Sequence, residues 1–150
     1  MGDDPVEHAA GKARSVDGEG RPVLGVDTDV FCEGRRLGKP TDAAAAADML
    51  ELLSGRTHEV VSGLCLRGEG WEELHRAVTR VEFRPLAGAE IERYVAAGEW
   101  EGRAGAYAIQ GLGASLVERV EGDYLNVVGL PASLLVRLLA ERFSGRYGFG

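Results

Sequence analysis

The chain has 150 residues, 45% of them hydrophobic and 27% charged, a composition typical of one globular domain, which we expect to span residues 1–150. Its formal net charge of −7 argues against a nucleic-acid-binding protein, because phosphate backbones are bound by clustered Lys and Arg. No apolar run approaches the roughly 18 residues of a membrane span, and the first residues lack a secretion signal. Cys32 and Cys65 are too few for a disulfide framework, so we expect reduced core thiols in a cytoplasmic protein.

The first expected element is a helix that begins after Asp4. Asp4 is a good N-cap, Pro5 suits the first helical position, and Glu7 falls where a capping box requires it. Lys12 lies at the edge of the apolar stripe of this helix, where its stem can pack while its ammonium reaches outward. The stripe repeats at helical spacing through Val6, Ala9, Ala10, Ala13 and Val16.

A mostly apolar run over residues 23–31 predicts a buried strand, yet it carries Asp27 and Asp29. Burying an ionised carboxylate is costly unless it is paired, hydrogen-bonded or bound to a metal. We therefore expect Asp27 at the carboxyl end of the strand, the place where open α/β sheets bind ligands. The alternative is that Asp27 and Thr28 only cap or turn the chain.

A glycine-containing loop ends at Lys39 and Pro40, directly before a helix predicted over residues 43–53. It is not a P-loop, because only three residues separate its glycines and Pro40 replaces the Ser or Thr that would bind magnesium. Lys39 precedes a helix N-terminus, which is a natural anion site, although an ordinary solvated loop lysine would look the same. Only Lys12 and Lys39 among the 17 basic residues are lysines, and a compact ammonium suits phosphate oxygens.

The remaining pattern completes an α/β fold, which we expect to be a mixed twisted sheet with flanking helices. The three histidines have no metal-ligand spacing with one another, so we interpret them as surface or satisfied polar residues. The final helix is expected from Pro131, with four leucines, Leu134, Leu135, Leu138 and Leu139, supplying core. The other predicted elements are strands over 58–67 and 77–83, a helix over 86–97, and strands over 104–110, 115–120 and 125–128.

Six motifs, in order and with near-family spacing, resemble the successive signatures of the Maf family. The likeness runs from Asp4 to about Leu139, and an Ala-x-x-Lys-Ala pattern at 9–13 resembles the family's helix before its Asp-containing strand. The six motifs are LGVDT at 24–28, LGKP at 37–40, ML at 49–50 with LSGRTHEV at 53–60, GEW at 98–100, AGAYAIQG at 104–111 and NVVGLP at 126–131.

The resemblance implies a fold related to the inosine triphosphate pyrophosphatases and a nucleoside triphosphate pyrophosphatase activity. Such enzymes use a divalent cation, Mg²⁺ or Mn²⁺, and release a nucleoside monophosphate and pyrophosphate. The resemblance makes Asp27 the proton acceptor and a metal ligand, and places Lys12 and Lys39 in the phosphate pocket. Thr28 and Gln110 match base-selecting positions of the branch that acts on dTTP and UTP, and modified uridine nucleotides are expected substrates too. The alternative for Gln110 is that it ties strand ends together.

The chain also departs from the family. Members begin with a strand, a Ser-x-x-Arg loop and an acidic residue, and this chain starts at the helix that follows. We expect the DNA upstream of Met1 to encode that segment in frame. Without it a sheet edge is left open, which favours a homodimer. Asp29 stands where the family usually has an apolar residue, and Arg103 where it often has Lys. A different reading is therefore a catalytically impaired nucleotide-binding or septum-linked interaction protein; a third, that all these polar residues are structural, requires six coincidences.

Overall fold

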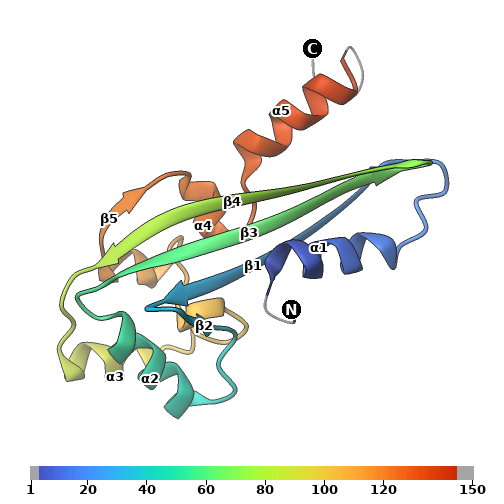
Figure 1. Ribbon diagram of the computed structural model, residues 1–150. Helices are drawn as coiled ribbons and strands as arrows, with labels where there is room; N and C mark the ends of the chain where they lie inside the picture. The colour runs from blue at the N-terminus through green and yellow to red at the C-terminus, as the bar shows by residue number, and fades with distance from the viewer. Residues whose placement is uncertain (1–3, 145–150) are drawn as a thin grey trace.

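The structure is a computed structural model that describes residues 4–144. Five described strands form one sheet in the order β2-β1-β3-β4-β5 (Figure 1). The expected α/β fold with a sheet and flanking helices is confirmed. All four pairings are antiparallel, however, and not mixed, because turns or returning connections reverse the chain between neighbouring strands. The strands are β1 (Val23–Cys32), β2 (Arg35–Leu37), β3 (Thr57–Gly68), β4 (Trp71–Phe83) and β5 (Val117–Glu121).

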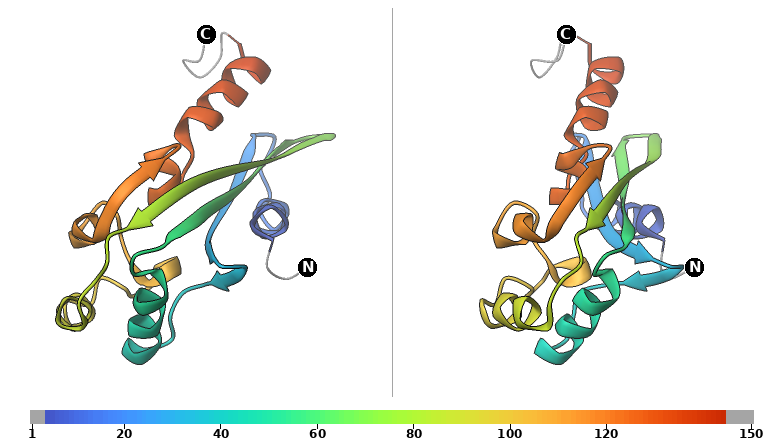
Figure 2. Two further views of the ribbon diagram at one scale, coloured as in Figure 1. Left: turned by 60° about the vertical axis from the view of Figure 1, so that its left-hand side comes forward. Right: turned by 90° about the vertical axis from the view of Figure 1, so that its left-hand side faces the viewer.

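The helices cover separate parts of this sheet (Figures 1 and 2). Helix α1 packs on β1 and β3, whereas α2 and α3 contact each other beyond one end of the sheet. Helix α5 projects from the rest of the fold in all the views. It contacts the start of β4 through Arg142, whose guanidinium lies 3.9 Å from the Trp71 ring centroid. The helices are α1 (Pro5–Arg14), α2 (Ala43–Leu53), α3 (Gly88–Ala96), α4 (Tyr124–Val128) and α5 (Ala132–Arg142), with 3₁₀ helices η1 (Ala104–Ala106) and η2 (Leu112–Leu116).

The first half of the chain follows its local signals closely. The Asp4 side chain caps α1 by accepting a hydrogen bond from the Val6 amide at 3.0 Å, and Asp42 caps α2 in the same way. The β3–β4 hairpin turns through Glu69 and Gly70. Strand β4 begins at Trp71 and not at residue 77, since its pairing with β3 starts there. The first half of β4 alternates between exposed and half-buried residues, so it lacks the continuous apolar pattern from which the strand was predicted.

Two strands predicted in the second half of the chain are wrong. Residues 104–110 form η1 and turns, because Gly105 and Ala106 adopt positive φ angles of 73° and 69° that an extended strand cannot contain. Residues 125–128 lie in α4, where Asp123 caps the helix by accepting from the Leu125 amide at 2.8 Å. A short apolar run fits either structure, and here the cap decides. The strand predicted over residues 115–120 does form: it is β5, which starts at Val117, after η2.

The main core lies between the sheet and the helices α2 and α3, and includes Val30, Leu50, Val81 and Phe83. Cys32 and Cys65 are free and buried, as expected. The expectation for the last helix is wrong in part: of its four leucines, only Leu138 is fully buried. The other three are half-buried because α5 has a neighbour along only part of its surface. Within residues 4–144, no helix is long and apolar enough to cross a membrane.

Helix α1 approaches the sheet closely because two strand glycines lie beneath it. A Cβ atom added at Gly25 would be 2.2 Å from the Ala9 carbonyl oxygen, and one at Gly63 would be 2.4 Å from the Pro5 carbonyl carbon. Real side chains do not fit at such distances, so both positions require glycine. The small side chains of Ala9 and Ala13 complete the contact. This contact sets the height of α1 above β1, and with it the position of the polar side chains on α1.

Candidate functional site

Asp27 lies in the middle of β1, not at the carboxyl end, because the strand continues to Cys32. The structure tolerates a carboxylate there because both oxygens have partners. The Lys12 ammonium lies 2.8 Å from Oδ1, and Nδ1 of His8 lies 3.2 Å from Oδ2. The Asp27 side chain is 18% exposed, so it remains accessible to a small ligand. The alternative that Asp27 and Thr28 cap or turn the chain is wrong, because both pair with β3 inside the strand.

A cavity of about 260 Å³ lies around the edge of β1. Asp27 and Thr28 point to opposite faces of the strand, since successive side chains alternate, yet both line this cavity. They can do so because β1 pairs with β2 only from Val30 onward. From Val23 to Asp29, β1 has a strand partner on one side only among the described residues.

All five side chains that the sequence marks out as site residues line this cavity. They come from α1, β1, the loop before α2 and the turn after η1, so the fold assembles them from distant parts of the chain. Arg103 lines it too, although its role was left open. The apolar wall includes Val30, Val60, Tyr107 and Ile109, and the predicted residues are Lys12, Asp27, Thr28, Lys39 and Gln110.

Three cationic side chains, Lys12, Lys39 and Arg103, share the cavity. Lys39 and Arg103 come from two loops that are fastened together, since the Gly105 amide donates to the Gly38 carbonyl at 3.2 Å. Lys39 lies three residues before the α2 N-cap. The Asp42 carboxylate already accepts from the Ala45 amide there, so the helix end is occupied by the chain's own carboxylate. Lys39 therefore contributes its charge to the cavity and not to an open helix terminus.

Thr28 and Gln110 occupy different surroundings in the cavity. The Thr28 hydroxyl is 2.7 Å from the Ser62 hydroxyl on β3 and donates to the Gly129 carbonyl at 3.3 Å. This places the turn after α4 beside β1. Gln110 is exposed in the turn between η1 and η2. The alternative that it ties strand ends together is wrong, because no strand ends there.

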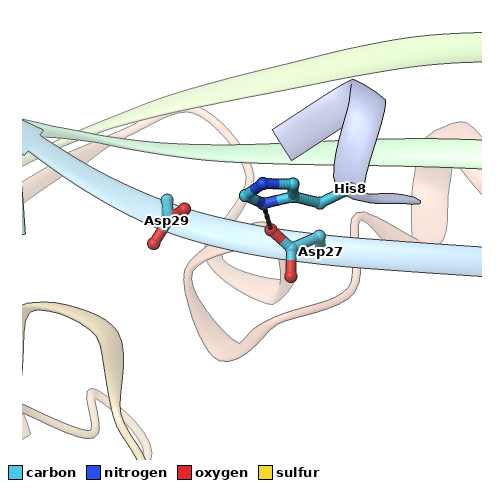
Figure 3. Close-up of side chains that lie close together, drawn as sticks. All are labelled: His8, Asp27 and Asp29. Carbon is cyan, nitrogen blue, oxygen red and sulfur yellow. Dashed lines mark hydrogen bonds and ion pairs between the residues drawn. The ribbon is translucent and has the colours of Figure 1, made fainter. Parts of the chain in front are cut away.

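His8 is a site residue that the sequence analysis does not predict, because the three histidines have no metal-ligand spacing with one another. His8, Asp27 and Asp29 each offer one ligand atom, and these atoms lie within 4.8 Å of one another (Figure 3). Asp29 is buried, and its carboxylate accepts from Arg36 Nε at 2.8 Å. Burial raises the pKa of Asp29, and the Arg36 guanidinium opposes that shift. A helical histidine facing a strand carboxylate has no sequence signal that could have revealed it.

The spacing of these three groups suits a divalent cation. Two carboxylates and one imidazole are common ligands of divalent metals, and ligands that share one metal lie a few ångströms apart. Lys12 and Arg36 partly neutralise the two carboxylates, so the cluster can also be stable without a metal. Asp27, the predicted metal ligand, belongs to the cluster together with two groups that were not predicted.

His58 belongs to the core beside the cavity. Its Nε2 atom lies 2.7 Å from the Tyr107 hydroxyl, and its ring packs edge-on against Phe83 with ring centroids 5.0 Å apart. Burial lowers the pKa of His58 to about 4, because a charged imidazolium would lose its hydration there. The other ring nitrogen, Nδ1, is buried without a hydrogen-bond partner among residues 4–144, so His58 is only in part the satisfied polar residue that the sequence interpretation expects.

The fold and the cavity define an α/β protein with a pocket lined by three cationic side chains, a lining that suits an anionic ligand. A family model described as "Maf-like protein" matches residues 3–142. The chain belongs to the Maf family.

Several relatives carry the name "dTTP/UTP pyrophosphatase". The relative from Moorella thermoacetica is 56% identical over 120 residues, which cover 79% of this chain and 62% of that protein. The relative from Pyrococcus furiosus is 47% identical over 122 residues, covering 78% and 62%. The relative from Gloeobacter violaceus is 49% identical over 139 residues, covering 91% and 73%. The chain therefore spans about three fifths of the length of the first two relatives.

Proposed function

We propose that this protein is a nucleoside triphosphate pyrophosphatase that hydrolyses dTTP and UTP to the monophosphate and pyrophosphate. The observation that carries the proposal is the convergence of five side chains from four segments on one cavity: Lys12, Asp27, Thr28, Lys39 and Gln110. The names of relatives that are 47–56% identical support the same reaction and the same two substrates.

In the proposed reaction, Asp27 accepts the proton of the attacking water. A bond forms between the water oxygen and the α-phosphorus, and the anhydride bond between the α- and β-phosphates breaks. Pyrophosphate leaves with the bonding electron pair. The Lys12 ammonium donates a hydrogen bond to the Asp27 carboxylate, and Lys39 lines the same cavity. Their positive charges offset the negative charge that develops on the phosphate oxygens. Arg103 adds a third cation, and its planar guanidinium can bind two phosphate oxygens at once.

A divalent cation, Mg²⁺ or Mn²⁺, completes the proposed site. Asp27 would hold it, together with His8 and Asp29, whose ligand atoms lie within 4.8 Å of one another. When bound, the cation supplies Lewis-acid stabilisation of the phosphate oxygens. The chain's own groups still orient the nucleotide and take the proton.

Thr28 and Gln110 are the proposed base-selecting residues. A side-chain amide can donate to one carbonyl of uracil or thymine while it accepts from N3–H, and cytosine reverses part of that pattern. A site that leaves such groups unpaired with the wrong base rejects it. The short Thr28 side chain leaves the base C5 position unguarded, so modified uridine nucleotides are accepted as well.

Three further predictions complete the proposal. The protein works in the cytoplasm as a homodimer, and its ligand is a free nucleotide and not a nucleic acid or a membrane. Among residues 4–144, the edge of β1 from Val23 to Asp29 has no second strand partner, which supports pairing with another segment or a second copy. Size-exclusion chromatography with light scattering tests the dimer.

Pyrophosphate release from dTTP, UTP, CTP and 7-methyl-GTP, with Mg²⁺ or Mn²⁺, tests the proposed activity. The assay is run on the 150-residue chain and on the chain extended by any residues that its gene encodes in frame upstream of Met1. We expect dTTP and UTP to be preferred. Preference for 7-methyl-GTP would overturn the substrate assignment. Binding of dTTP without turnover by both chains would favour the alternative, a nucleotide-binding or septum-linked interaction protein that keeps the scaffold.

A further inference from the structure

The turn that carries Gln110 is attached to the end of α3 by one carboxylate. Glu99 lies just after α3, and its side chain accepts three hydrogen bonds. The Tyr94 hydroxyl donates to Oε1 at 2.5 Å, the Leu112 amide donates to Oε2 at 2.9 Å, and the Gly113 amide donates to Oε1 at 2.9 Å. Partial burial alone would raise the pKa of Glu99, but these three bonds outweigh it and hold the pKa below its ordinary value. The carboxylate is therefore ionised and fully engaged at neutral pH.

Tyr94 secures the other end of the same turn. Its hydroxyl accepts a hydrogen bond from the Ala108 amide at 3.0 Å while it donates to Glu99. Tyr94 is 6% exposed, so its ring is held by the core around α3. Residues 108–113 are thus fixed at both ends, two residues before Gln110 and two to three residues after it.

The turn is also shaped to receive this carboxylate. A Cβ atom added at Gly111 would lie 2.2 Å from Oε2 of Glu99, so only glycine lets the backbone come this close. A Cβ atom at Gly113 would lie 2.3 Å from the Ala108 carbonyl oxygen, which closes the turn on itself. The backbone on either side of Gln110 therefore has little freedom, while the Gln110 side chain stays exposed at the cavity.

We propose that Glu99, acting together with Tyr94, is a positioning residue that holds Gln110 in the orientation that selects the nucleotide base. The inference rests on the proposed function, because it assumes that Gln110 contacts the base. Hydrogen-bonded selection requires the amide to be held in place before the ligand arrives, since a mobile amide can rotate to satisfy either cytosine or uracil. Neither Glu99 nor Tyr94 lines the cavity, so their hydrogen bonds reach Gln110 through the turn, while the charge of Glu99 also acts on Arg103 in the cavity wall.

The test replaces Glu99 by Gln, which has nearly the same shape. One oxygen becomes an NH₂ group, which must then face the amide of Leu112 or Gly113, and two donors cannot bond to each other. Tyr94→Phe is the second variant, and it removes the hydroxyl without removing the ring. Glu92→Gln is the matched control, because it removes a carboxylate from an exposed position on α3.

Two measurements distinguish release of the turn from loss of base selection. Hydrogen exchange at the Leu112 and Gly113 amides reports whether the turn is released. The ratio of the dissociation constants for CTP and dTTP, with the ratio of kcat/KM values beside it, reports base selection. For Glu99→Gln and Tyr94→Phe we expect faster exchange at these amides and a loss of about tenfold in preference for dTTP, with kcat for dTTP largely kept. Glu92→Gln should change neither.

The outcomes distinguish this inference from the proposed function. If the wild-type protein prefers dTTP and both variants release the turn yet keep the full preference, the positioning role of Glu99 is refuted while the proposed function stands. Unchanged amide exchange in both variants would also refute it. A wild-type protein that shows no preference and no turnover refutes the base-selecting role of Gln110, and the positioning inference is overturned with it.

Discussion

The ammonium of Lys12 lies 2.8 Å from Oδ1 of Asp27 and 3.2 Å from the carbonyl oxygen of Val26, so this one side chain of α1 forms two hydrogen bonds with β1. The Lys12 side chain is 59% exposed, and a screened surface pair of this kind adds little stability. Its exposure leaves Lys12 free to turn toward an incoming phosphate without disturbing the fold. The contact is therefore better suited to binding than to stabilising the protein.

Asp27→Asn tests the proposed base. The amide keeps the shape of the side chain but cannot take a proton from water, so we expect pyrophosphate release from dTTP to fall by a factor on the order of 10² or more. The melting temperature should change little, because the partly exposed pair with Lys12 contributes little stability. Asp48→Asn, an exposed change on α2, is the control. Equal rates for Asp27→Asn and the wild-type protein would remove Asp27 from the mechanism.

Gln110→Ala tests the proposed base selection directly. Loss of the amide should weaken the preference for dTTP and UTP over CTP, because the hydrogen bonds that discriminate between the bases are gone. Since Gln110 is exposed, the variant should fold normally. A uniform decrease for all nucleotides would mean that Gln110 contributes to binding but not to discrimination.

Gly63→Ala and Gly11→Ala test the contact between α1 and the sheet. A Cβ at Gly63 would meet the Pro5 backbone at 2.4 Å, so we expect the free energy of unfolding to fall by about 1–3 kcal/mol. A Cβ at Gly11 has no atom within 4 Å, and alanine favours the helix, so Gly11→Ala should stabilise by up to about 1 kcal/mol. Urea denaturation measures both changes. If Gly63→Ala is as stable as the wild-type protein, the close approach of α1 is wrong.

His58→Phe tests the pH dependence of stability. Burial lowers the pKa of His58 from 6.5 to about 4 in the folded protein. Between these values the unfolded chain binds a proton that the folded chain does not, so the free energy of unfolding falls as the pH is lowered from 6.5 to 4. The full loss is about 3 kcal/mol, and it is complete below pH 4.

His58→Phe should flatten the stability profile across that window, whatever it does to stability at neutral pH. Denaturation midpoints at several pH values measure the slopes. A slope that persists unchanged in His58→Phe would assign the pH dependence to other groups.

The sequence alone determined the elements whose signals are local. The Asp4 and Asp42 caps, the helical spacing after each cap, and the mostly apolar runs of β1 and β3 depend on residues a few positions apart, and these elements form as predicted. Chemistry and the family motifs single out five side chains, and the fold brings them to one cavity: Lys12, Asp27, Thr28, Lys39 and Gln110.

The tertiary structure decided what depends on segments far apart in the chain. Strand directions, the place of Asp27 inside β1 and its contact with His8 follow from how α1 and the strands pack. Residues 104–110 bend at Gly105 and Ala106 and are not a strand, because the Gly105 amide bonds to the Gly38 carbonyl and the Ala108 amide to the Tyr94 hydroxyl in place of a strand partner. A short segment satisfies its backbone wherever distant partners allow, and those partners exist only once the chain has folded.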